Sequence, residues 1–194
     1  MSSRAYVPAV QADVAGPARA CGGLAVVDVS SLLIDLYGRI PEVARDAVDE
    51  LDVGRLTEAP APGANTIAWL VWHIARVQDS HVAELLGADQ LWVTGDWAPR
   101  FGLDADPSNT GYGHSTEDVL TVRPESPQVL LDHLDSVGAR TLAMLGGLSS
   151  DDLDRIVDRG WHPPVTLGVR LVSVAEDSLQ HAGQARYVRG LLGA

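Results

Sequence analysis

The sequence predicts an all-α protein, a four-helix bundle with a long irregular loop between its second and third helices. Four long segments repeat apolar residues at helical spacing, and each follows a Ser, Thr or Asn that can cap a helix. No segment shows the alternating pattern of a strand hairpin or the helix–strand rhythm of an α/β fold. The 194 residues suffice for one domain with a hydrophobic core.

The N-terminal part predicts a leader followed by the first helix. Residues 1–28 mix Gly, Pro and Ala without a period, so we expect a flexible leader before a single domain over 29–194. The pattern predicts the first helix over 32–51, with Ser30 or Ser31 as its cap. Pro41 lies inside this pattern and is expected to kink the helix or to mark a restart.

A Pro-rich stretch over 57–65 predicts a loop, after which Asn65 or Thr66 starts a second helix that ends near Gly87. The apolar residues of this second helix recur every three or four positions, as expected for a face that packs in a core. They are Ile67, Leu70, Val71, Ile74 and Val77.

Residues 88–126 lack a long period and predict the irregular loop. A stretch of this length is uncommon within one domain and is often functional. Asp96 is a candidate cap for a short turn closed by Gly102, and "STED" is a capping-box signature.

The C-terminal part predicts two more long helices. Ser126 followed by Pro127 opens the third, over 128–148, because proline favours the first helical position. A short capped helix is expected over 149–157. Thr166 then introduces the last helix, over 167–193.

Composition excludes several classes of function. The 26 acidic and 14 basic residues give a formal charge of −12, which repels nucleic acid and anionic lipid. No apolar run approaches the roughly 18–20 residues of a membrane span, so we expect a cytoplasmic protein with no membrane partner. The single cysteine, Cys21, excludes a disulfide framework and a cysteine metal cluster.

The last helix carries a candidate pair of metal ligands. Asp177 and His181 are four residues apart, so both lie on one face of a helix and can reach one ion. Two further His/acid pairs have this spacing, but one lies in a Gly-rich stretch and the other runs into two prolines. Only the pair in the last helix is well placed.

A divalent metal needs at least one more protein ligand, which bundles recruit from a facing helix. The second helix offers His73 and His81, about 12 Å apart along the axis, so they cannot serve the same ion. Each can equally be a hydrogen-bonded core or boundary residue, and the residues alone leave this alternative open.

The segments "NTIAWLVWHIARVQDSH" and "TLGVRLVSVAEDSLQHAGQARYVRGLL" resemble the DinB-like superfamily of metal-binding four-helix bundles, as do "GDWAPRFGL" and "TGYGHSTEDVL". The resemblance runs from about Ser30 to the C-terminus and is strongest to actinobacterial mycothiol transferases and related mycothiol-dependent maleylpyruvate isomerases. It implies a metal held by His73, Asp177 and His181. Many members have His or Glu where this chain has Asp177, whose side chain is one methylene shorter than that of Glu.

The resemblance also implies chemistry. Two imidazoles and a carboxylate suit zinc best, with iron, nickel and manganese as alternatives. Mycothiol would be the thiol co-substrate and a small electrophile the second substrate, in an S-transfer or an isomerisation. Gln184, one turn beyond His181, is either a partner that orients a ligand or an exposed amide.

Two other functions stay open. A metal-dependent hydrolase would activate water at the same site, and a non-catalytic bundle would bind a small ligand or a second copy of itself. Dimers are common among similar bundles, so a homodimer is one of the expected oligomeric states.

The long loop is expected to supply a wall of the ligand pocket. Arg100 offers a bidentate grip on a carboxylate, and His114 a polar contact to the substrate or cofactor. Apolar surface is expected from four aromatic residues, Trp92, Trp97, Phe101 and Tyr112. The alternative is that the aromatic residues pack the loop onto the bundle and that Arg100 pairs with a neighbouring acid.

Overall fold

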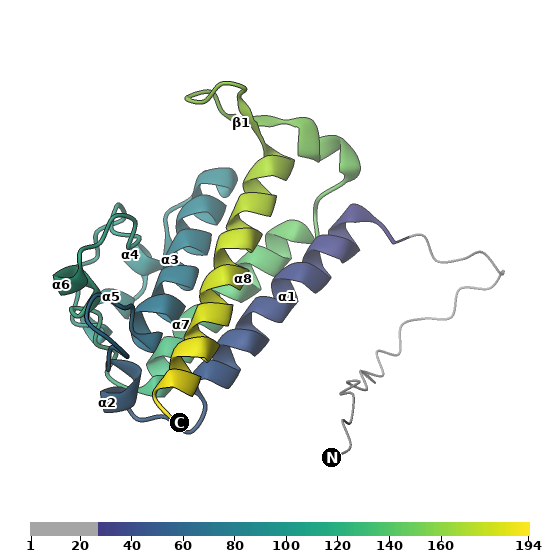
Figure 1. Ribbon diagram of the computed structural model, residues 1–194. Coiled ribbons are helices and arrows are strands. Elements are labelled where there is room, and N and C mark those ends of the chain that lie inside the picture. The colour runs from purple at the N-terminus through teal and green to yellow at the C-terminus, as the bar shows by residue number, and fades with distance from the viewer. Residues whose placement is uncertain (1–26) are drawn as a thin grey trace, which may run out of the picture.

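Four long helices form a bundle in the computed structural model, which describes residues 27–194 (Figure 1). They are α1 (Val29–Val48), α3 (Ile67–Leu86), α7 (Pro127–Leu145) and α8 (Leu167–Leu191). Helices α1 and α3 each pack on α7 and α8, so α1 and α3 lie across a diagonal of the bundle. The predicted all-α bundle is confirmed. The predicted leader, except for its last two residues, lies outside the described residues.

Side-chain caps fix where the long helices begin. The predicted caps Thr66, Ser126 and Thr166 each accept a hydrogen bond from the backbone N–H three residues on. The predicted cap of the first helix was wrong, because Asp28 rather than Ser30 or Ser31 is the cap. Its carboxylate accepts from the Ser31 N–H at 2.7 Å, and a negative charge also suits a helix N-terminus.

Of the two expectations for Pro41, the restart was wrong, because α1 runs without interruption through this residue. Tertiary contacts hold the turns on both sides. The Tyr37 hydroxyl donates to the Leu171 carbonyl at 2.7 Å, and Ile40 and Ala44 are fully buried. Packing of this face therefore outweighs the hydrogen bond that proline cannot donate.

The predicted irregular loop follows α3 and contains three four-residue helices. These are α4 (Leu91–Thr94), α5 (Trp97–Arg100) and α6 (Thr116–Val119). The capping box of Ser115 and Asp118 is confirmed at α6, whereas Asp96 precedes α5 without a capping side-chain hydrogen bond. In Figure 1 this loop lies beside α3 on the side away from α1. One further short helix, α2 (Val53–Leu56), follows α1.

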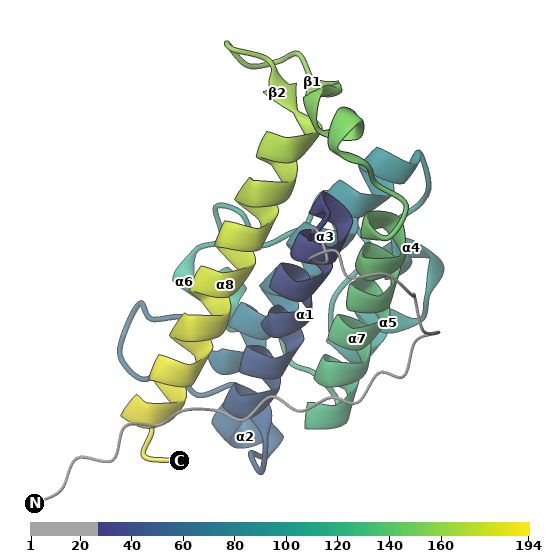
Figure 2. The same cartoon turned by 90° about the vertical axis from the view of Figure 1, so that its right-hand side faces the viewer.

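The predicted helix over 149–157 was wrong in its second half. A 3₁₀ helix spans Ser150–Asp154, and the chain then forms β1 (Ile156–Asp158), antiparallel to β2 (Val165–Thr166). This small hairpin stands at one end of α8 (Figure 2). Two adjacent β-branched residues favour an extended chain here, and the two prolines between the strands prevent helix continuation.

Helix α3 is buried on more than the one face that its apolar stripe predicted. The bundle covers one side of α3, and the irregular loop covers another. Trp72 is therefore fully buried, with the Trp92 ring edge-on to it at 6.0 Å between centroids. Within the described residues, no helix combines the length and apolarity of a membrane span.

His133 on α7 lies in a box of aromatic rings under the loop. The box consists of Trp92, Trp97 and Phe101, whose ring centroids are 5.1–5.5 Å from that of His133. The imidazole is fully buried, and neither of its nitrogens has a hydrogen-bond partner among residues 27–194. Burial, helped by the nearby charge of Arg76, lowers the pKa of His133 to about 3.

This burial predicts a loss of stability in mild acid. Between pH 6.5 and 3 the unfolded chain protonates His133 and the folded protein does not, so stability falls as pH falls. The free energy of unfolding contributed by this residue should fall by about 1.4 kcal/mol from pH 7.5 to 5.5. Denaturant unfolding of wild type and His133→Leu at both pH values measures this difference. An equal pH dependence in the two proteins would contradict it.

Candidate metal centre

Three side chains from two helices meet at one side of the bundle. His73 comes from α3, and Asp177 and His181 come from successive turns of α8. One ligand atom from each lies within 4.8 Å of the other two. His73 Nε2 is 3.8 Å from Asp177 Oδ2, and His181 Nε2 is 3.5 Å from Asp177 Oδ1. The structure thus brings together the three residues that the resemblance selected.

Hydrogen bonds behind the two imidazoles orient them. His73 Nδ1 lies 2.5 Å from the Thr110 carbonyl oxygen, and His181 Nδ1 lies 2.8 Å from Gln184 Oε1. Both partners are acceptors, so each Nδ1 carries a proton, and in the neutral ring each Nε2 directs toward Asp177 a lone pair that can bind a metal ion. This is the arrangement of metal-ligating histidines, and it gives Gln184 the orienting contact that was one of its two predicted roles.

The carboxylate of Asp177 lies between the two imidazoles, and one of its oxygens is available to a further ligand. Asp177 Oδ2 is buried and accepts no hydrogen bond from the described residues, which is costly for a charged oxygen. Burial raises the pKa of Asp177, but the imidazoles of His181 and His73 outweigh it and hold this pKa below its usual value. The carboxyl is therefore ionised, as metal coordination requires. A divalent cation between the three side chains would satisfy Oδ2 and both free lone pairs.

Aromatic packing holds the His73 ring in place. Trp69, one turn earlier on α3, stacks on it with centroids 4.7 Å apart and planes 6° from parallel. The Trp69 indole N–H donates to His114 Nδ1 at 3.1 Å, and His114 Nε2 lies 2.9 Å from Asn109 Oδ1. Both nitrogens of His114 are thus engaged within the protein, in the ring packing behind the candidate metal centre.

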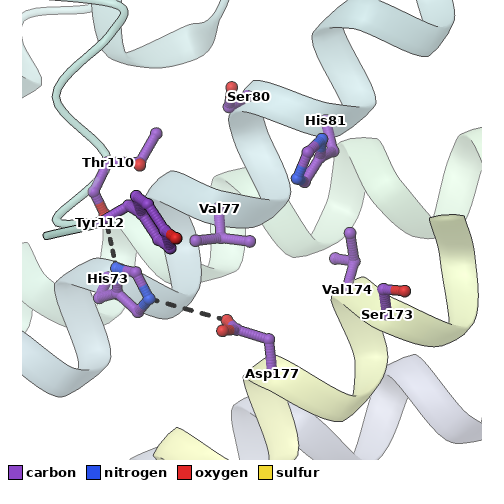
Figure 3. A pocket seen from close by; sticks show the side chains of 9 residues that line it. All are labelled: His73, Val77, Ser80, His81, Thr110, Tyr112, Ser173, Val174 and Asp177. Atoms are coloured by element: carbon purple, nitrogen blue, oxygen red, sulfur yellow. Dashed lines mark hydrogen bonds and ion pairs between the residues drawn. The ribbon is translucent and has the colours of Figure 1, made fainter. Parts of the chain in front are cut away.

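A cavity of about 370 Å³ opens beside His73 and Asp177 (Figure 3). Besides these two residues, its walls come from α3, α8 and the irregular loop. They are Val77, Ser80, His81, Thr110, Tyr112, Ser173 and Val174. A ligand in this cavity would contact an ion held by the three side chains. The candidate metal position therefore faces a substrate-sized space.

The loop residues predicted to contact a ligand lie in different places, and Trp92 and Phe101 are fully buried against His133, away from the cavity. Tyr112 lines the cavity and is highly exposed. His114 lies behind His73, as described above. Trp97 packs on His133, and Arg100 pairs with Glu125 at 3.2 Å and lies over the Trp97 ring, so neither lines the cavity. For Trp97 and Arg100, these contacts agree with the alternative in which the aromatic residue packs the loop onto the bundle and the arginine pairs with a neighbouring acid.

Arg76, which the sequence reasoning did not single out, attaches the loop to α3. Its guanidinium is fully buried, donates to the Asn109 carbonyl at 3.1 Å and to Gln90 Oε1 at 2.9 Å, and lies over the Trp92 ring. Asp79, one turn later, pairs with it at 3.4 Å and accepts from two N–H groups at the start of α4. The available signal was an Arg and an Asp three residues apart within an apolar helix.

Gly111 brings the loop into close contact with His73. Its φ is +93°, and a Cβ at this position would lie 2.7 Å from His73 Nδ1 and 3.0–3.1 Å from two tryptophan rings. We expect Gly111→Ala to displace the loop and break the hydrogen bond from His73 to Thr110. Metal affinity should fall roughly 10–100-fold, as for other lost ligand-orienting contacts. Calorimetric titration with Zn²⁺ measures this.

Gly113→Ala is the matched control for this substitution. Gly113 also has a positive φ, +77°, but a Cβ there would meet nothing within 4 Å. Both variants carry the backbone strain of a left-handed residue, and only Gly111→Ala carries the clash. Equal zinc affinities in the two variants would show that the clash does not reach the candidate metal centre.

Known proteins are similar to this chain in sequence and in fold. A family model described as the DinB superfamily matches residues 37–185. A crystal structure of a conserved protein from Enterococcus faecalis is similar over 87% of this chain and all of its own, with 32% identity and a TM-score of 0.80. No functionally curated protein matches the chain.

Proposed function

Because the chain belongs to the DinB superfamily, whose members often bind a divalent metal, we propose that it is a metal-dependent thiol transferase or isomerase. One observation carries the proposal: two histidine Nε2 atoms and a carboxylate oxygen that accepts no hydrogen bond from the described residues converge beside a substrate-sized cavity. Three protein ligands leave coordination positions open for a substrate, as in catalytic rather than structural metal sites.

The thiol would come from a co-substrate, because residues 27–194 contain no cysteine. A bound divalent ion, zinc by the donor set, would stabilise the thiolate, the competent nucleophile, at neutral pH. Mycothiol is the proposed thiol. Its sulfur would form a bond to an electrophilic carbon while the leaving group departs with its electron pair, and the thiol proton would pass to solvent.

The protein's own residues would position these reactants. Trp69, Thr110 and Gln184 fix the two imidazoles, so little reorganisation is needed when substrates bind. Val77 and Val174 give the cavity wall apolar surface close to the ligands. This surface would exclude water from the reacting sulfur and favour thiol attack over hydrolysis.

Two measurements test the proposal in sequence. Elemental analysis of purified protein should find about one divalent ion per chain. The Co²⁺-loaded protein should then develop a thiolate-to-metal charge-transfer absorption with mycothiol and consume the thiol when an electrophile panel is added. Absence of metal uptake would favour a non-catalytic bundle. Turnover of ester or amide substrates without thiol would favour a hydrolase.

A further inference from the structure

The cavity has a second polar end, at His81. This residue lies on α3 two turns beyond His73, and its ring extends toward α8 between Val77 and Val174 (Figure 3). Eight residues correspond to about 12 Å along the helix axis, so His81 stands well apart from the candidate metal centre. Between the two ends, the two valines provide apolar wall.

A contact with Arg170 determines the protonation of His81. Arg170 Nη1 on α8 lies 2.6 Å from His81 Nδ1. A guanidinium can only donate, so Nδ1 must accept and the proton of the neutral ring is on Nε2. Burial and the charge of Arg170 lower the pKa of His81 and outweigh Glu84, 3.8 Å from Nδ1, and Asp177, which raise it, in agreement with a neutral imidazole.

The Nε2–H group is a donor available to a ligand. Within the described part of the chain, hydrogen bonding engages only the Nδ1 side of this ring. The His81 side chain is 34% exposed and lines the cavity beside Ser80 and Ser173. A ligand that fills the cavity therefore meets a fixed N–H donor at the end away from the metal ligands.

The charges around this end disfavour an anionic ligand group. Arg170 Nη2 pairs with Asp158 at 2.9 Å, and Nη1 pairs with Glu84 at 3.3 Å. Two carboxylates around one guanidinium leave an excess negative charge, and the whole chain is acidic as well. The acceptor that fits a neutral donor in a negative field is an uncharged carbonyl oxygen.

We propose that His81 determines specificity by donating from Nε2 to an uncharged carbonyl oxygen of the ligand. This inference rests on the proposed function, because the other end of the same ligand binds the metal held by His73, Asp177 and His181. The ligand class is then a metal-binding head, a short apolar link that contacts Val77 and Val174, and an amide or ketone carbonyl.

Ligands with an imidazole head test this without any thiol chemistry. The probes are ω-(imidazol-1-yl)alkanamides of increasing chain length, with carboxylates and plain alkyl chains of equal length as comparisons. Calorimetric titration of the Ni²⁺-loaded protein should show, at one best length, that the amide binds roughly 3–10-fold more tightly than the alkyl chain. The carboxylate should bind more weakly than the amide.

Two variants of His81 complete the test. His81→Leu removes the donor and should bring the amide and the alkyl chain to equal affinity. His81→Gln keeps an oxygen that can accept from Arg170 and an N–H that can donate, so part of the preference should persist. Both variants should take up Ni²⁺ as the wild type does, and circular dichroism melting reports whether they fold.

The outcomes separate this inference from the proposed function. Equal affinity of the metal-loaded wild type for amide and alkyl probes overturns the role of His81 and leaves the metal centre standing. An amide preference that persists in His81→Leu overturns it as well. Failure of the wild type to take up Ni²⁺ rejects the proposed function and this inference with it. The wild-type comparison decides even if a variant does not fold.

Discussion

The variant His181→Ala is expected to lose stable metal binding. It removes one of the three candidate protein ligands. The two that remain, His73 and Asp177, are too few to bind a divalent ion stably in competition with water. The loss of affinity for Zn²⁺ should exceed the roughly 10–100-fold that changes in ligand-orienting contacts cause. Calorimetric titration and elemental analysis of the purified variant measure this loss.

Thermal unfolding provides a second measurement of the same prediction. Zinc that binds only the folded protein should raise the melting temperature of the wild type and leave that of His181→Ala nearly unchanged. Glu176→Ala is the matched control, since Glu176 is an exposed acid on α8 next to Asp177 and outside the ligand cluster. If His181→Ala and the wild type responded equally to zinc, the three side chains would not be the metal ligands.

Local sequence signals predicted most of the fold, because helix ends depend on nearby residues. Thr66, Ser126 and Thr166 accept the N–H groups of the turns that they start, and Gly87 takes the left-handed conformation that ends α3. The errors arose where distant contacts decide. Pro41 is held in a continuous helix by packing of α1 on the bundle, and the hairpin over 156–166 forms by pairing of two short strands.

The sequence could predict some residues of the candidate site but not others. Helical spacing placed Asp177 and His181 on one face, but spacing could not choose between His73 and His81 as the facing residue. The resemblance selected His73, and the structure shows why the two differ: His73 Nε2 approaches Asp177, whereas His81 Nδ1 accepts from Arg170 at the other end of the cavity.

The contact that orients His73 could not be predicted from the sequence, for a physical reason. Its orienting partner is the backbone carbonyl of Thr110, and every residue has such a group, so no residue type marks it. The role of Gly111 depends in the same way on a close approach that only the folded chain reveals. The prediction instead selected loop residues with distinctive side chains. Two of these, Arg100 and Trp97, lie away from the cavity.

The variant Arg76→Met is expected to destabilise the fold and weaken the candidate metal centre together. The side chain of Asp79 is also fully buried, and Arg76→Met leaves it with Arg140, at 3.6 Å, as its ion-pair partner, so the loss should reach at most the roughly 3–5 kcal/mol of a broken buried pair. Arg76 also donates to the carbonyl groups of Asp106, Pro107 and Asn109, so the loop that carries Thr110 loses its attachment. Denaturant unfolding should show the loss of stability, and Zn²⁺ titration a roughly 10–100-fold loss of affinity.

Arg39→Met separates this effect from the loss of any arginine. Arg39 forms an exposed ion pair with Asp35 on α1, with both side chains more than 60% exposed, and such pairs contribute about 0–1 kcal/mol. This control should therefore change neither the free energy of unfolding nor the zinc affinity by much. If Arg76→Met lost stability but bound zinc as the wild type does, other contacts would hold Thr110 in place. The buried guanidinium would then stabilise the fold without supporting His73.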